Sequence, residues 1–213
     1  MTNKEYEQEI NKYINRLKIL RKKGISIAAG IIGTNLFMED LYFIASADRS
    51  INLIDGIIQM FLNRNLTCVG VLLRMQMDNC LRSYAAFIAE NKDEVVKCII
   101  SGDKINNKKD KNGKKMNDGY LKEQIAEIDP NFPKVYNQVC GYVHLSSKAF
   151  YQTIDKLEGE EFAFQVGLPL PERRNPYLIE AAEAFEHYVK LHYKMLIAVA
   201  ESKSKFDSQY NDL

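Results

Sequence analysis

Apolar residues recur every three or four positions along most of the chain, and this spacing predicts a succession of α-helices. The first helix is expected to begin at Thr2, a residue type that is common at helix starts, and to end at Gly24. Tyr6, Ile10 and Leu17 belong to its apolar face. Further helices are expected over residues 36–47, 51–63, 66–90, 92–100, 120–128, 133–144, 150–157 and 176–203. Residues 162–166 alternate with period two instead, which is typical of one short extended strand.

The helix expected over residues 66–90 is apolar nearly all round, which is typical of a central helix covered by its neighbours. The chain shows neither an internal repeat nor a linker, and its 213 residues with 46% hydrophobic content suffice for one sizeable core. The pattern therefore predicts an all-α fold. We expect a single-domain helical bundle of about six to eight helices over residues 1–213, with at most one short extended segment.

Residues 101–118 interrupt this pattern because they hold six lysines, three aspartates and few apolar side chains. Such a composition buries too little surface to order itself, so a mobile basic loop is expected there. A frayed C-terminal tail is expected over residues 205–213. Lys108 and Lys109 in the loop are candidate phosphate contacts, and the alternative is a plain solvated loop.

The overall charge and the cysteines narrow the classes of partner. Lys and Arg total 29 against 28 Asp and Glu, so the chain has almost no net charge. A positively charged surface that binds nucleic acid would therefore have to be confined to one part of the molecule. The four cysteines form no CxxC pair and no histidine stands at metal-ligand spacing, which favours free thiols and neither a metal nor a cofactor. The polar N-terminus and the short apolar run 25–32 favour a cytoplasmic protein with no membrane segment.

Three charged residues share one sector of the expected central helix. Arg74, Asp78 and Arg82 are spaced four apart, so they lie within about 80° of one another around the helix axis. Asp78 can pair with both arginines, which leaves guanidinium donors for a phosphate or carboxylate group. The alternative is an internal ion network that braces the bundle.

His144 is the second candidate, because it places an imidazole in a segment that otherwise has the pattern of a buried helix. Gly141 allows close approach of a ligand, and Tyr142 and Ser146 supply polar groups within two residues. Ser146 can also cap a helix that begins there and leave backbone amides free for an anion. The alternative is a helix-end histidine that is hydrogen-bonded to a carbonyl or carboxylate.

The arginine-bearing helix, followed much later by residues 142–146, forms a pattern that resembles helical bacterial proteins related to the HEPN (higher eukaryotes and prokaryotes nucleotide-binding) superfamily. The resemblance covers residues 66–154 and implies a helical bundle that is often dimeric and acts in toxin–antitoxin or phage-defence systems. Active members are metal-independent ribonucleases whose motif places an arginine shortly before a histidine at a helix start. His144 matches that histidine, and Asn137 is the nearest polar residue to the arginine position.

Two functional hypotheses follow. In the first, the chain is a metal-independent ribonuclease, or an RNA- or nucleotide-binding protein, that forms a homodimer. His144 moves the proton in this hypothesis, Arg74 and Arg82 stabilise phosphate charge, and Asp78 orients them. The RNA contacts are then Tyr142, Ser146, Asn137, Lys108 and Lys109.

In the second hypothesis the chain is a non-catalytic helical interaction module that binds a partner protein or a small anionic ligand. The Arg/Asp stripe is then structural or holds the ligand. The separation between His144 and the two guanidiniums discriminates between the hypotheses, because general acid–base chemistry needs the groups at one site.

Overall fold

The computed structural model describes residues 1–144, 146, 154–158, 161–164, 166–167 and 169–211. Within these residues the chain forms seven α-helices, two 3₁₀ turns and two short strands, which confirms the all-α single-domain bundle. The α-helices are α1 (Asn3–Ile32), α2 (Met38–Leu62), α3 (Leu66–Ile88), α4 (Lys92–Ile100), α5 (Asp118–Ala126), α6 (Phe132–Val143) and α8 (Asn175–Asn211). The 3₁₀ turns are η1 (Ile105–Asn107) and η2 (Glu172–Arg174), and the strands are β1 (Ile154–Glu158) and β2 (Glu161–Phe164).

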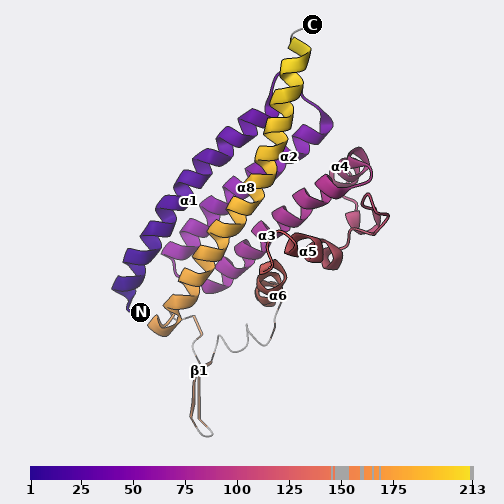
Figure 1. Ribbon diagram of the computed structural model, residues 1–213. Coiled ribbons are helices and arrows are strands. Elements are labelled where there is room, and N and C mark those ends of the chain that lie inside the picture. The colour runs from indigo at the N-terminus through magenta and orange to yellow at the C-terminus, as the bar shows by residue number, and fades with distance from the viewer. Residues whose placement is uncertain (145, 147–153, 159–160, 165, 168, 212–213) are drawn as a thin grey trace.

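The long helices α1, α2, α3 and α8 form the body of the bundle, and α4, α5 and α6 lie on the side away from α1 (Figure 1). Helix α3 packs against α2, α4, α5, α6 and α8, so it is the central helix that the apolar pattern predicts. Leu73, Met77 and Leu81 on α3 are buried, and each such side chain stabilises the fold by about 1.5–3 kcal/mol. This packing fixes the polar side chains that α3 also carries.

Helices α1 and α2 run through positions where the sequence pattern predicts a break. Helix α1 continues through Gly24, where a Cβ would overlap the Tyr193 hydroxyl on α8, so the glycine serves a close helix contact. Helix α2 runs through the expected break near Ser50, whose hydroxyl donates to Gln76 Oε1 on α3 (2.9 Å). In both cases a residue typical of helix ends makes a contact between helices instead.

Residues 101–118 pack against the bundle, so the prediction of a loop that buries too little surface to order itself is wrong. Ile105 and Met116 are buried, and so is the carboxylate of Asp110. Asp110 accepts hydrogen bonds from two backbone N–H groups at 2.8 and 3.0 Å and from the Tyr120 hydroxyl at 2.5 Å. One buried carboxylate thus organises a turn whose lysines stay near the surface, which composition alone does not reveal.

The strands β1 and β2 pair antiparallel, with Ile154 opposite Phe164. Strand β2 confirms an extended segment near residues 162–166, but residues 154–157 are strand where a helix was expected. Residues 150–153 of that expected helix lie outside the described residues. The limit of one extended segment is therefore wrong, because a single strand leaves its backbone N–H and C=O groups unpaired and a second strand supplies partners.

Helix α8 extends through Asn211, so the described part of the expected C-terminal tail is helical and not frayed. The Asp207 carboxylate accepts a hydrogen bond from the Thr34 backbone N–H (2.8 Å), and Lys203 forms a buried ion pair with Asp40. These contacts fasten the end of α8 to the connection between α1 and α2. Polar anchoring of this kind offsets the low apolar content of the segment.

Candidate functional site

Arg74 on α3 faces α6, where its guanidinium meets a tyrosine and a cysteine. It forms an ion pair with Asp78, one turn further along α3, and donates a hydrogen bond to the Tyr136 hydroxyl. Its Nε lies 3.4 Å from Cys140 Sγ, and its Cζ lies 3.7 Å from the centre of the Tyr136 ring. Arg74 is therefore committed to contacts that hold α6 against α3.

Arg82 has a different partner. Its Nη2 donates to Asp118 Oδ1 at the start of α5 (2.7 Å), and Asp118 Oδ2 accepts a hydrogen bond from Tyr136 (3.3 Å). The prediction that Asp78 pairs with both arginines is wrong, because α5 brings a second carboxylate to Arg82. The stripe is thus part of an ion network between α3, α5 and α6, made of Asp78, Arg74, Tyr136, Asp118 and Arg82.

His144 directly follows the last residue of α6 and is exposed, so the expectation of an imidazole inside a buried helix is wrong. The preceding turn is placed by Tyr142, whose ring lies so close to Gly70 on α3 that a Cβ there would overlap it. Gly70 and Arg82 are separated by roughly 18 Å along the α3 axis, given a rise of about 1.5 Å per residue. The four predicted catalytic residues, His144 with Arg74, Asp78 and Arg82, therefore do not assemble into one site.

Ser146 and Asn137, two of the predicted RNA contacts, each have a hydrogen-bond partner within the protein. Ser146 Oγ donates to the Gly141 carbonyl oxygen (2.7 Å), so it closes the C-terminal end of α6 instead of capping a new helix. Asn137 Oδ1 accepts a hydrogen bond from Lys122 Nζ on α5 (3.0 Å). Ser146 is thus engaged within the end of α6, and Asn137 takes part in the contact between α5 and α6.

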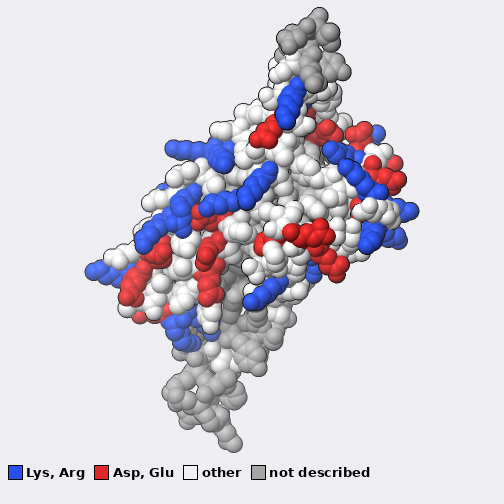
Figure 2. Space-filling view, in the orientation of Figure 1, with Lys and Arg blue, Asp and Glu red and all other residues white. Residues whose placement is uncertain are grey.

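Lys108 and Lys109 lie beside acidic residues at the N-terminal end of α4. Lys108 Nζ is 3.3 Å from Glu94 Oε2, and the Lys109 carbonyl accepts a hydrogen bond from the Glu90 backbone N–H (3.1 Å). The face of the molecule in Figure 2 likewise shows acidic and basic side chains interspersed. A surface that binds a polyanion needs a face on which basic residues predominate, and they do not predominate on the face shown.

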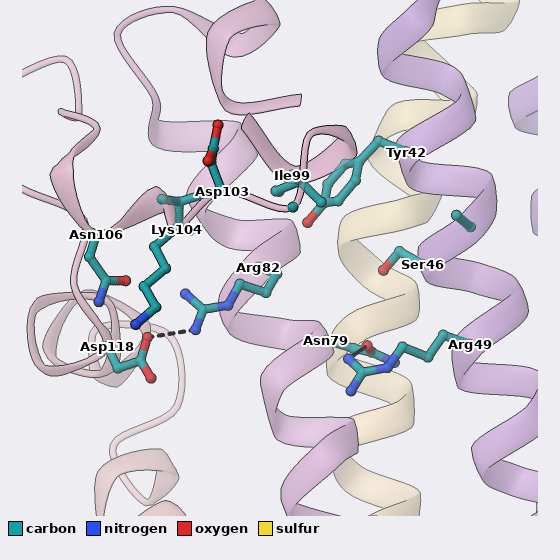
Figure 3. A pocket seen from close by; sticks show the side chains of 13 residues that line it. Tyr42, Ser46, Arg49, Asn79, Arg82, Ile99, Asp103, Lys104, Asn106 and Asp118 are labelled. Carbon is teal, nitrogen blue, oxygen red and sulfur yellow. Dashed lines mark hydrogen bonds and ion pairs between the residues drawn. The ribbon is translucent and has the colours of Figure 1, made fainter. Parts of the chain in front are cut away.

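Arg82 also lines a cavity. A cavity of about 590 Å³ lies between α2, α3 and the segment from the end of α4 to the start of α5 (Figure 3). Its size is within the range of pockets that bind small molecules. The lining residues are Tyr42, Ala45, Ser46, Arg49, Asn79, Arg82, Ile99, Gly102, Asp103, Lys104, Ile105, Asn106 and Asp118.

Three cations reach this cavity, and they differ in how they are paired. Arg82 is paired with Asp118, whereas Arg49 Nη1 donates to the neutral amide oxygen of Asn79 (2.6 Å). Figure 3 shows Lys104 extending from the α4–α5 connection toward Arg82 and Asp118. A guanidinium has five N–H donors, so Arg49 keeps both its charge and most of its donors for a ligand.

Buried amides hold Arg49 in place. Asn79 Nδ2 donates to Gln76 Oε1 (3.3 Å), which also accepts a hydrogen bond from Ser50 Oγ (2.9 Å). Ser50, Gln76 and Asn79 are all at most 2% exposed. Because buried polar groups with complete hydrogen bonding are rigid, this chain fixes the acceptor that orients the Arg49 guanidinium.

A second buried polar cluster lies directly behind the cavity wall. His192 on α8 is fully buried, with Nε2 at 2.8 Å from Ser46 Oγ and 3.1 Å from Ser83 Oγ. The two hydroxyl oxygens are 3.1 Å apart. Burial lowers the pKa of His192 to about 3, so the imidazole is neutral at physiological pH. Ser46 is the member of this cluster that also lines the cavity.

Sequence reasoning identified Arg82 but missed Arg49, Asn79 and Lys104. A usable signal was present: Ser46 and Ser50 are spaced four apart on α2, inside a stripe that is otherwise apolar. Polar residues at helical spacing on a buried face need partners on a facing helix, and α3 supplies them. Lys104 carries no comparable signal, because its position depends on how the α4–α5 connection folds.

Comparison with protein-family models, curated proteins and solved structures finds no match at any of the three levels. Among the residues that the structure describes, no group of three or more His, Cys, Asp or Glu is placed to hold a metal ion. No helix in the described part of the chain is long and apolar enough to cross a bilayer.

Proposed function

We propose that this protein is a non-catalytic helical module that binds a small anionic ligand, a phosphate or a carboxylate, in the cavity between α2, α3 and the α4–α5 connection. The observation that carries the proposal is the pairing of Arg49. Its guanidinium is oriented by the neutral Asn79, so its positive charge is not compensated by that contact. Arg82 and Lys104 line the same cavity and add to the positive potential.

The cavity also contains carboxylates, but one of them is already engaged. Asp118 accepts hydrogen bonds at both oxygens, from Arg82 and from Tyr136, and Asp103 is exposed. Three basic and two acidic side chains leave a local charge of +1. Arginine binds phosphate and carboxylate groups through paired N–H donors, so an oxyanion is the ligand chemistry that this balance favours.

Another part of the lining is apolar and suits an organic group that carries the anion. Tyr42, Ile99 and Ile105 contribute an aromatic ring and two aliphatic side chains. Burial raises the pKa of Tyr42, so its hydroxyl stays protonated and is able to donate a hydrogen bond. An apolar wall with a few converging polar groups is the usual composition of small-molecule pockets.

The ribonuclease hypothesis has less support. It requires His144 together with Arg74 and Arg82, and the first of these lies at the far end of α6 from the Asp118–Arg82 pair. The cavity around Arg82 contains no histidine among its lining residues, all of which the structure describes. Binding without catalysis is the function that the arrangement favours.

Titration calorimetry with inorganic phosphate tests the proposal. Wild-type protein is expected to bind phosphate, and Arg49→Gln to weaken the binding about tenfold or more, because a hydrogen bond to a charged group contributes about 1.5–3 kcal/mol. Arg21→Gln is the matched control, since Arg21 forms a surface ion pair with Asp55 on the α1–α2 face. Absence of binding by the wild type, or an equal loss in both variants, contradicts the proposal.

A parallel assay addresses the catalytic alternative. Purified wild-type protein is incubated with single-stranded RNA, and the RNA is expected to remain intact. Cleavage by the wild type that His144→Ala abolishes, with no change in melting temperature, would contradict the assignment of a non-catalytic module. The two assays use independent readouts, so the anion site and the absence of catalysis are judged separately.

A further inference from the structure

The Ser46 hydroxyl is shared between the buried cluster and the cavity, so the direction of its hydrogen bond matters. His192 Nε2 is within hydrogen-bond distance of Ser46 and Ser83, whereas Nδ1 is buried and has no hydrogen-bond partner in the described part of the chain. A neutral imidazole carries one hydrogen, on either Nδ1 or Nε2. The two choices give different hydrogen-bond directions at Ser46.

Placing the hydrogen on Nδ1 leaves a buried N–H donor without an acceptor, which is rare in folded proteins. Placing it on Nε2 lets the ring donate to a serine oxygen and leaves only an acceptor unpaired at Nδ1. The second arrangement costs less, so His192 is protonated at Nε2. Ser46 Oγ is the nearer acceptor, at 2.8 Å against 3.1 Å for Ser83.

Because Nε2 then donates and no longer accepts, Ser46 Oγ at 3.1 Å is the one acceptor left for the Ser83 hydroxyl among the residues that the structure describes. Ser46 Oγ thus accepts from both His192 and Ser83. Its own hydrogen does not point back at either donor, and the remaining open direction is the cavity that Ser46 lines.

We infer that Ser46 donates its hydroxyl hydrogen into the cavity and binds an unprotonated oxygen of the ligand, a role that depends on the proposed anion site. Ser46, Tyr42 and Arg49 then present donors at one wall. Such a wall favours a group with unprotonated oxygens, such as those of phosphate or carboxylate, over a group that only donates hydrogen bonds. His192 is a positioning residue that orients Ser46, and Nε2–H leaves no base there to activate the serine as a nucleophile.

Phosphate binding by Ser46→Ala and Ser83→Ala tests the direction of the hydrogen bond, again by titration calorimetry on the full chain. Ser46→Ala is expected to weaken phosphate binding about tenfold, as when one hydrogen bond to a charged group is removed. Ser83→Ala removes a hydroxyl from the same cluster that does not line the cavity, so its affinity is expected within about twofold of the wild type. Equal effects in the two variants, with normal wild-type binding, overturn the role of Ser46.

A second measurement does not require a variant to fold. Long-range ¹H–¹⁵N correlation spectra of the wild type report which nitrogen of His192 carries the hydrogen, and Nε2 is expected. Protonation at Nδ1 overturns the inference about Ser46 and leaves the anion site intact. Failure of the wild type to bind phosphate overturns the anion site and this inference together, so the two failures are distinguishable.

Discussion

The contribution of an ion pair to stability depends on how buried its two side chains are, and the pair between Lys203 and Asp40 is an example. Both side chains are 4% exposed, and Lys203 Nζ also lies 4.3 Å from the centre of the Phe37 ring. By contrast, the pair between Arg21 and Asp55 has side chains 40% and 47% exposed. Water screens the exposed pair far more than the nearly buried one, so two ion pairs of the same kind contribute differently to stability.

Lys203→Met is therefore expected to lower the free energy of unfolding by about 3–5 kcal/mol, because it leaves Asp40 buried without its cation. Arg21→Met is the control and is expected to cost less than about 1 kcal/mol. Urea denaturation followed by circular dichroism measures both. The double variant Asp40→Asn, Lys203→Met is expected to recover part of the loss. Equal destabilisation by the two single changes would contradict the buried pairing.

At the scale of elements, the helix pattern predicted most of the fold because burial on one face imposes a repeat that the sequence displays directly. The starts of α3, α4 and α5 carry Asn caps at Asn65, Asn91 and Asn117, whose side chains accept a backbone N–H as expected of such residues. The folding of residues 101–118 was not predictable in this way. It depends on one buried aspartate, and a single polar residue leaves no periodic signal.

Two glycines on neighbouring helices provide a test of how α3 and α6 pack. A Cβ at Gly70 would overlap the Tyr142 ring, whereas a Cβ at Gly56 on α2 would lie at an ordinary 3.6 Å from Leu72. Gly70→Ala is expected to destabilise the protein by about 1–3 kcal/mol through overpacking. Gly56→Ala is expected to stabilise it by about 0.5–1 kcal/mol, since alanine is the better helix former.

Thermal unfolding by circular dichroism compares the two glycine variants with the wild type. Opposite signs are expected for the changes in melting temperature. A stabilising Gly70→Ala would mean that Tyr142 does not pack against α3 as described, and the placement of α6 would need revision. The same result would also remove the argument that His144 lies far from Arg82.

At the scale of the whole molecule, the candidate site could be predicted only in part because its walls come from distant segments. Arg82 was identifiable on α3, but the cavity needs α2 and the α4–α5 connection as well. Arg49 and Lys104 are 55 residues apart in the chain, and nothing in local spacing relates them. The grouping of His144 with Arg82 was not predictable for the same reason, since the end of α6 lies away from Arg82 and no local pattern reports that separation.

A ligand held between these segments binds the folded chain and not the unfolded one, so it must stabilise the whole molecule. At a phosphate concentration of about 100 times Kd the expected gain is about 2.7 kcal/mol, which raises the melting temperature of a chain of this size by roughly 5–10 °C. Arg49→Gln is expected to show a much smaller rise at the same concentration. Sodium chloride at matched ionic strength separates binding from screening, and a formal net charge of +1 predicts that screening alone changes stability little. An equal rise in chloride and phosphate, or in the variant and the wild type, would show that phosphate acts on the surface in general and not in the cavity.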